Sequence, residues 1–169
     1  NTAIKRCLSA AKKKCYFTTP YFVPAGWFIK ALIHAAARGV DVRVLTAGRN
    51  DVPAALIAGR HTYGRLLKNH IRIYEMKEKT LHAKNFTMDS AFGSVGSYNI
   101  DNWSSRHNLE VNVAAISPHL AEKLEEQFFK NLKRSEEILL RDWRKRPLYK
   151  QALQFLLYSF SHVISRLSN

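Results

Sequence analysis

A histidine, a lysine and an aspartate follow one another closely in the stretch LHAKNFTMD, residues 81–89. His82 and Lys84 are two residues apart, so their side chains would share one face of a β-strand. An imidazole can attack phosphorus or deliver a proton, and a lysine ammonium neutralises charge on the non-bridging oxygens of a phosphate. The types and spacing of these two residues therefore indicate phosphoryl-transfer chemistry.

The aspartate of this stretch is out of phase with the other two residues. Asp89 lies at odd separation from both His82 and Lys84, so in a regular strand it would face the other side of the sheet. We expect it in a turn with Ser90, as a structural carboxylate and not a third reacting group. A bulge in the strand would reverse this expectation.

A run of small residues, GSVGSYN at 93–99, follows at once. Ser97 and Asn99 share a face, and the small residues permit a ligand to approach the backbone closely. Hydroxyl and amide groups at these two positions could donate hydrogen bonds to a phosphate, although hydroxyls in such turns often only cap the backbone.

A third polar stretch, NLEVNV at 108–113, alternates apolar and polar residues. We expect its apolar face, with Val111 and Val113, to enter the core. The other face carries Glu110 between two amides, and a buried glutamate beside His82 would fix the tautomer of the imidazole. No cluster of carboxylates points to a metal site, so we expect neither a metal nor a cofactor, and ammonium and amide groups would do the electrostatic work.

Strands and helices must position these residues, and their pattern indicates the fold class. Strands are predicted from alternation and from β-branched and aromatic content at 15–19, 40–46, 71–76, 81–88, 92–99 and 108–116. Helices are predicted from apolar stripes at 2–14, 26–39, 52–70 and 117–139. Ser117 is a natural N-cap, with Pro118 at the first helical position. Because the early strands alternate with helices and the later ones do not, we expect an α/β fold with a mixed β-sheet flanked by helices.

The overall charge narrows the class of partner. Among 169 residues there are 27 Lys and Arg against 13 Asp and Glu, a formal net charge of +14. Such a chain favours anionic partners such as phospholipid headgroups or nucleic acid. Its two cysteines, Cys7 and Cys15, imply no disulfide framework, and a cytosol-facing protein fits.

The last part of the chain carries a separate signal. After the basic segment RDWRKR at 141–146, apolar residues recur at helical spacing to the end, too few and too interrupted to span a bilayer. We predict a C-terminal amphipathic helix lying in the headgroups of an anionic membrane; the alternative is a helix packed on protein. The predicted organisation is a catalytic half domain over 1–135 and a basic, amphipathic helical tail over 136–169.

The motif and its flanks resemble a known family. His82, Lys84 and Asp89 form the pattern H-x-K-x4-D, which, with GSVGSYN and NLE after it, resembles the signature of the phospholipase D superfamily. The stretches TPYFVPAGWFIKALIHAAARGVDVRVL and GSYNIDNWSSRHNLEVN resemble the C-terminal half of a bacterial cardiolipin synthase. The resemblance covers roughly residues 3–132 and implies a phospholipase D-like layered fold.

The resemblance implies a two-step mechanism through a phosphatidyl-histidine. One motif's histidine attacks the phosphodiester, and the histidine of a second motif protonates the leaving alcohol. His82 would be the nucleophile or the general acid, and the family pattern favours the acid for a second motif. The implied reaction is cardiolipin synthesis from phosphatidylglycerol, or from another phosphatidyl donor, at the cytosolic face of a bacterial membrane.

The resemblance also assigns roles to the neighbouring residues. Lys84 and Asn99 would bind the substrate phosphate, and Ser97 could help. Glu110 would orient the imidazole, and Asp89 is the aspartate of the motif.

Only one such motif is present, whereas the family's active site needs two. The other histidines considered, His34, His61 and His70, lack the lysine and the aspartate. We expect the second motif to come from an N-terminal half that is missing here or, alternatively, from a second copy of the chain. Two other functions stay open: a phospholipase D-type hydrolase or a phosphodiesterase acting on nucleic acid, and a non-catalytic membrane-binding module. The apolar tail favours lipid over nucleic acid.

Overall fold

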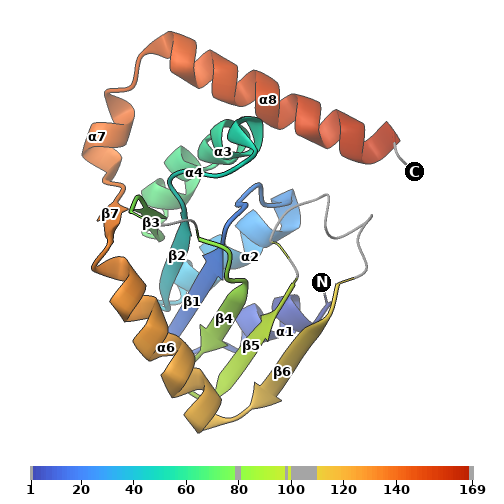
Figure 1. Cartoon of the computed structure of the whole chain (residues 1–169), viewed down its shortest axis with the longest axis vertical. Helices are drawn as coiled ribbons and strands as arrows, with labels where there is room; N and C mark the ends of the chain where they lie inside the picture. Colours follow the sequence, from blue (N-terminus) through green and yellow to red (C-terminus); the bar gives the residue numbers. More distant parts are fainter. Residues whose placement is uncertain (1, 79–80, 98, 100–109, 168–169) are drawn as a thin grey trace.

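The computed structural model of the chain describes residues 2–78, 81–97, 99 and 110–167. A seven-stranded sheet runs through its centre in the order β6-β5-β4-β1-β2-β3-β7, with helices on both faces (Figure 1). The strands are β1 (Lys14–Thr19), β2 (Asp41–Ala47), β3 (Arg72–Met76), β4 (Asn85–Met88), β5 (Phe92–Gly96), β6 (Asn112–Ile116) and β7 (Ser135–Glu137). The helices are α1 (Thr2–Ala10), α2 (Gly26–Ala37), α3 (Pro53–Arg60), α4 (Tyr63–Lys68), α6 (Pro118–Leu132), α7 (Leu140–Arg144) and α8 (Leu148–Leu167).

The predicted mixed sheet is confirmed. β1, β2 and β3 are parallel, and helices form the connections between them, as parallel pairing requires. β4, β5 and β6 follow one another as antiparallel neighbours, and β4 also pairs with β1. The parallel strands β1 to β3 and the antiparallel strands β4 to β6 therefore meet at the β1–β4 pair, in the middle of the sheet.

The core lies on both faces of β1 because alternate residues point to opposite sides. Tyr16 stacks on Phe128 of α6, with ring centroids 5.0 Å apart. Phe17 points the other way and meets Phe28 of α2 edge to face at 5.3 Å. The two faces of the central strand are thus covered by different helices.

A buried carboxylate joins α3 and α4 to the sheet. Glu75 in β3 is 2% exposed and accepts hydrogen bonds from the guanidinium of Arg60 at 2.6 and 2.8 Å. The hydroxyl of Tyr63 donates to the same carboxylate at 3.0 Å. Burial raises the pKa of Tyr63 well above its usual value, and the charge of Glu75 adds to the effect. This cluster fixes α3, which packs against the C-terminal helix, and α4, which contacts α7.

The helix predicted over 117–139 is shorter than expected. It begins as predicted, with the Ser117 hydroxyl accepting from the N–H of Leu120, but it ends at Leu132. The prediction is wrong beyond that point, where Ser135–Glu137 form β7 on the outer edge of β3. Glu137 binds Arg72 of β3, so a tertiary contact overrides the helical tendency of the stretch. The division predicted between residues 135 and 136 stays a prediction.

The prediction that the apolar face of the 108–113 stretch enters the core is wrong for its described residues. β6 is an edge strand, and Val111 and Val113 are 74% and 63% exposed. The helix on that face, α6, packs over the neighbouring strand, where Gly93 of β5 faces Leu120. α6 does not extend over β6, so Val111 and Val113 stay exposed.

The predicted C-terminal helix is present as α8, which packs along α3 (Figure 1). Within the described ranges, no helix has the length and apolar content that crossing a bilayer requires.

Candidate functional site

The histidine and lysine of the motif lie just before β4. This strand begins at Asn85, so the predicted strand over 81–88 is shortened at its start. Asn85 pairs with Thr18 near the end of β1, because the two strands are antiparallel. His82 and Lys84 therefore lie at the end of the sheet formed by the C-terminal ends of the parallel strands, which is where α/β proteins commonly bind ligands.

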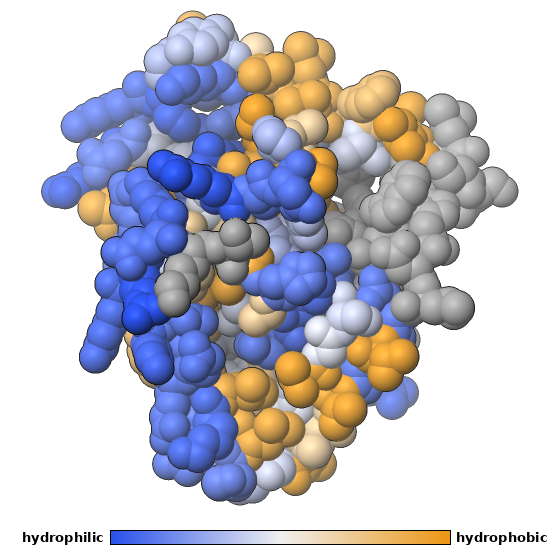
Figure 2. Space-filling view, viewed as in Figure 1, coloured by the Kyte–Doolittle hydropathy of each residue, from blue (hydrophilic) through white to orange (hydrophobic). Residues whose placement is uncertain are grey.

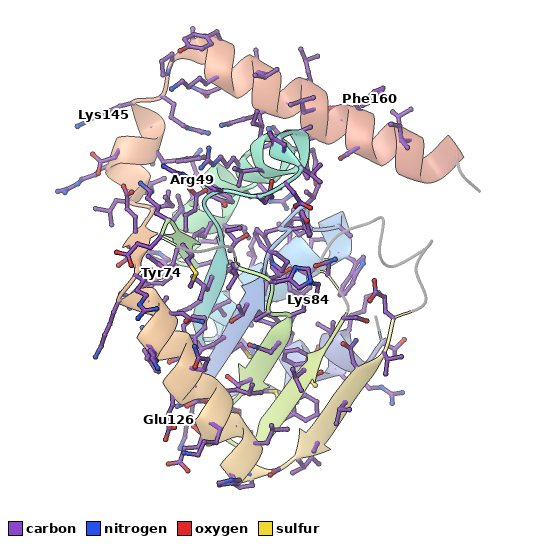
Figure 3. All side chains as sticks on the ribbon, viewed as in Figure 1. Arg49, Tyr74, Lys84, Glu126, Lys145 and Phe160 are labelled. Carbon is purple, nitrogen blue, oxygen red and sulfur yellow. The ribbon has the colours of Figure 1, made fainter. Side chains whose placement is uncertain are left out.

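His82 and Lys84 come together as their spacing predicts. The ammonium of Lys84 donates to the main-chain oxygen of His82 at 2.9 Å and lies 3.4 Å from its Nε2 atom. Lys84 is 9% exposed, whereas His82 is exposed. Figure 3 labels Lys84 near the start of β4. A phosphate that reaches Nε2 from solvent would thus lie beside the positively charged ammonium of Lys84, which its hydrogen bond to the backbone keeps in place.

A pocket of about 280 Å³ opens beside this lysine, between α1 and strands β4 to β6. Its polar lining includes Lys84, Ser94 and Asn112, and its apolar lining includes Phe86 and Phe92. The arrangement suits a phosphate ester that carries an apolar group. Over the residues that the structure describes, no group of three or more His, Cys, Asp or Glu side chains is placed to hold a metal ion.

The structure adds two residues that the motif did not indicate. The hydroxyl of Tyr21, in the loop after β1, donates to the carboxylate of Asp51, in the loop after β2. This hydrogen bond lowers the pKa of Asp51, and the charge of the nearby His82 lowers it further. The sequence could have indicated this pair only through the topology of the sheet, because loops that follow adjacent parallel strands meet at the same end of the sheet.

Ser97, another predicted site residue, bonds to the backbone of Val111 just before β6. Its hydroxyl accepts the N–H of Val111 at 3.0 Å, and its own N–H donates to the oxygen of Val111 at 3.0 Å. Ser97 thereby continues the pairing of β5 and β6. Asn99 and Glu110 are both half-buried and lie on the chain leaving β5 and entering β6. Their roles toward phosphate and imidazole stay predictions.

Asp89 lies at the other end of the sheet from His82. It occupies the predicted turn with Ser90, both residues having positive φ angles. Its carboxylate accepts the backbone N–H groups of residues 12, 13 and 14, at 2.8–2.9 Å, where β1 begins. Burial would raise the pKa of Asp89, but these three hydrogen bonds outweigh it and lower the pKa. The aspartate therefore joins the end of β4 to the start of β1 and the turn before it, and the structure does not bring it to the histidine.

Replacing Asp89 with Asn is expected to lower the free energy of unfolding by about 1–3 kcal/mol at pH 7, since an amide offers one acceptor oxygen for three donors. Because folding lowers the pKa of Asp89, its contribution is complete at neutral pH and is lost as the pH falls from about 4 through the folded-state value. Urea unfolding of both proteins at pH 7 and pH 3 measures this. The control is Glu126→Gln, which replaces an exposed carboxylate on α6. A wild-type advantage that stays constant between these pH values would contradict this role of the carboxylate.

Comparison with known proteins agrees with this geometry. The family model of the cardiolipin synthase phospholipase D-like domain matches residues 4–132. Cardiolipin synthase A of Proteus mirabilis (strain HI4320) is 32% identical over 155 residues, which are 92% of this chain and 32% of that protein. A cardiolipin synthase of Clostridium perfringens (strain SM101 / Type A) is 34% identical over 143 residues, 85% of this chain and 30% of that protein. The chain spans about a third of the length of these relatives.

Solved structures show the same fold at lower identity. A phospholipase D family member, Nuc from Salmonella typhimurium, superimposes with a TM-score of 0.71 and 23% identity, over 82% of this chain and 90% of that one. The phosphatidylserine synthase of Haemophilus influenzae Rd KW20 gives a TM-score of 0.76 and 14% identity, over 99% of this chain and 43% of that one. With the matched family model and the His82–Lys84 pair, these likenesses show that the chain belongs to the phospholipase D superfamily, in the family of the cardiolipin synthase phospholipase D-like domain.

Proposed function

We propose that this chain supplies one half of the active site of an enzyme that makes cardiolipin from phosphatidylglycerol, or from another phosphatidyl donor, through a phosphohistidine. The observation that carries the proposal is the approach of the Lys84 ammonium to Nε2 of the exposed His82, in a chain of this family. The pair offers a nucleophile or proton donor beside a charge that stabilises the phosphorus centre.

The reaction takes two displacements at phosphorus. In the first, an imidazole nitrogen bonds to the phosphorus of phosphatidylglycerol, the bond to the glycerol oxygen breaks, and a second histidine gives that oxygen its proton. In the second, a hydroxyl of another phosphatidylglycerol attacks, the phosphorus–nitrogen bond breaks, and the second histidine takes the hydroxyl proton. His82 performs one of these two roles, and we assign it the acid–base role.

Neighbouring groups hold the phosphate and the imidazole. Lys84 neutralises the non-bridging oxygens, and Asn99 donates a hydrogen bond to them. Ser97 joins only if its hydroxyl turns away from the backbone of Val111, to which it is now bonded. Glu110 orients the imidazole by accepting its second N–H.

The second histidine comes from another motif of the same type. The relatives are about three times as long as the stretch matched here, so a further half of such a protein is the first candidate to supply it. A second copy of the chain is the other. We place the assembled site at the cytosolic face of a bacterial membrane, where its anionic lipid substrate lies.

The test is a product assay on vesicles of phosphatidylglycerol labelled in the acyl chains. Wild type and His82→Ala are each assayed alone and with the part of the Proteus mirabilis relative that this chain does not match, produced separately. We expect cardiolipin from wild type and a loss of at least about 10³-fold in the variant, because a displacement without its acid or nucleophile is very slow. Rapid quenching and peptide mapping would locate the phosphatidyl adduct on a histidine.

Other outcomes would support other functions. Phosphatidic acid without cardiolipin would make the protein a hydrolase. Cleavage of labelled DNA, which the charge of +14 would help to bind, would make it a nuclease. The absence of any product from both mixtures, with lipid binding intact, would favour a non-catalytic membrane-binding module.

A further inference from the structure

The C-terminal helix turns its apolar side away from the protein. Five large apolar residues of α8 recur at helical spacing and are each between 45% and 69% exposed: Tyr149, Leu153, Leu156, Phe160 and Val163. Together we call them the outer face of α8. Figure 2 shows hydrophobic residues gathered along this helix, and Figure 3 shows Phe160 on it. A helix on a globular protein ordinarily buries such a stripe.

The side of α8 that meets the protein is the more polar one. Gln154 is 7% exposed and accepts a hydrogen bond from Arg146, and Gln151 donates to the main-chain oxygen of that arginine. One turn further, the hydroxyl of Tyr158 donates to the oxygen of Pro24, and its ring lies 4.9 Å from that of His61. These specific bonds fix the rotation of the helix about its axis, so the outward orientation of the apolar stripe is built into the fold.

Basic residues lie where this helix begins. Arg141, Arg144, Lys145 and Lys150 are all exposed, and they precede or open α8. In Figure 3, Lys145 marks this end of the helix. An apolar stripe with basic residues beside it complements a surface that is apolar within and anionic outside, which is an anionic lipid bilayer.

The position of α8 also relates this surface to the candidate site. α8 packs on α3 and touches Pro24 in the loop after β1, at the edge of the sheet where His82 and Lys84 lie (Figure 1). A bilayer against the outer face of α8 would thus lie at the same end of the molecule as the histidine and the lysine.

We propose that the outer face of α8 is a membrane-docking surface that lies in the headgroup layer of an anionic bilayer, with the basic residues at 141–150 on the lipid phosphates. The helix lies along the bilayer and holds the His82 end of the sheet toward it. The proposal rests on the proposed function only for the choice of phosphatidylglycerol, since docking requires no turnover.

The test is binding of the full chain to vesicles of phosphatidylglycerol, with phosphatidylcholine vesicles for comparison, by co-sedimentation. The variant Leu156→Asp/Phe160→Asp places two charges on the outer face, and the matched control Val113→Asp/Ile116→Asp changes two apolar residues of β6 that are at least as exposed. We expect the α8 variant to lose affinity for phosphatidylglycerol by at least about 100-fold, because each large side chain withdrawn from lipid costs roughly tenfold or more. We expect the control to bind like wild type.

Two further measurements check the fold of the variants and the depth of the helix in the lipid. Circular dichroism and the thermal midpoint should be the same for wild type and both variants, since all four positions are exposed. Phe160→Trp keeps an apolar residue on the outer face, so the fluorescence of the new indole should shift to the blue with phosphatidylglycerol vesicles. Lipids brominated in the acyl chains should quench that fluorescence.

Several results would overturn the proposal. Unchanged vesicle binding by Leu156→Asp/Phe160→Asp would show that the outer face of α8 does not bind lipid. A Phe160→Trp protein whose fluorescence does not respond to vesicles would show the same. If the α8 double variant instead converts an oligomer into a monomer while vesicle binding persists, a second copy of the chain covers the outer face. If the wild-type protein binds vesicles but makes no cardiolipin in the product assay, the proposed function is contradicted and the docking proposal is not. The two proposals can therefore fail separately.

Discussion

Replacing Glu75 with Leu is expected to lower the free energy of unfolding by about 3–5 kcal/mol. The Glu75 side chain is 3% exposed and is the acceptor for both Arg60 and Tyr63. Its removal leaves a guanidinium charge and a fully buried hydroxyl without these bonds, and such groups cost far more when unpaired than the pair itself contributes. Urea unfolding followed by circular dichroism measures the change.

The same experiment has a matched control on the neighbouring strand. Glu137 binds Arg72 at 3.0 Å, but about a third or more of each side chain is exposed, so Glu137→Leu should cost no more than about 1 kcal/mol. The double variant Arg60→Met/Glu75→Leu should recover part of the loss, because it removes the unpaired charge. Equal costs for Glu75→Leu and Glu137→Leu would show that burial does not decide the strength of the pair.

The parts of the fold that local patterns dictate could be predicted from the sequence. β1, β2 and β3 are short β-branched and aromatic runs that are buried on both faces, and helices fill the intervals between them. The start of α6 followed from its cap at Ser117. In these elements the intrinsic secondary-structure propensity, the hydrophobic pattern and the tertiary structure agree, so the sequence alone suffices to predict them.

The predictions are wrong where contacts with residues distant in the sequence determine the local structure. Residues 135–137 form a strand because β3 has a free edge and Arg72 meets Glu137 there, and neither fact is visible in the local sequence. The alternation at β6 predicts which residues share a face, but the position of the strand at the sheet edge leaves that face uncovered. In α8 the predicted apolar stripe is present, and the hydrogen bonds of Gln154 and Tyr158, which the spacing alone does not reveal, fix the direction in which it points.

The candidate site was partly visible in the sequence for the same reason. His82 and Lys84 are two residues apart, so a short extended stretch suffices to bring them together. Tyr21 and Asp51 are thirty residues apart and meet only because β1 and β2 are parallel neighbours. The spacing in the sequence therefore predicts that the histidine and the lysine lie together, whereas the neighbours of this pair follow only from the topology of the sheet.

Replacing Lys84 with Met is expected to lower the rate of cardiolipin formation by about 10²–10³-fold. The ammonium lies 3.4 Å from Nε2 of His82 on a residue that is only 9% exposed, so it faces the charge that develops on the phosphorus oxygens and is itself partly shielded from water. Met matches the lysine side chain up to its terminal nitrogen and keeps most of the packing against the pocket wall, so the loss would be electrostatic. The measurement is the initial rate in the product assay, together with the affinity for vanadate, an anion that mimics five-coordinate phosphorus.

Lys84→Arg separates charge from geometry. It keeps the positive charge but changes its shape and reach, so we expect an intermediate rate and a vanadate affinity closer to wild type. Urea unfolding of both variants checks that the fold persists. The interpretation is wrong if Lys84→Met binds vanadate as wild type does and loses less than about tenfold in rate, because the lysine would then serve mainly to hold the backbone oxygen of His82. A loss in rate that both variants share equally would instead show that the position of the ammonium, beyond its charge, sets the chemistry.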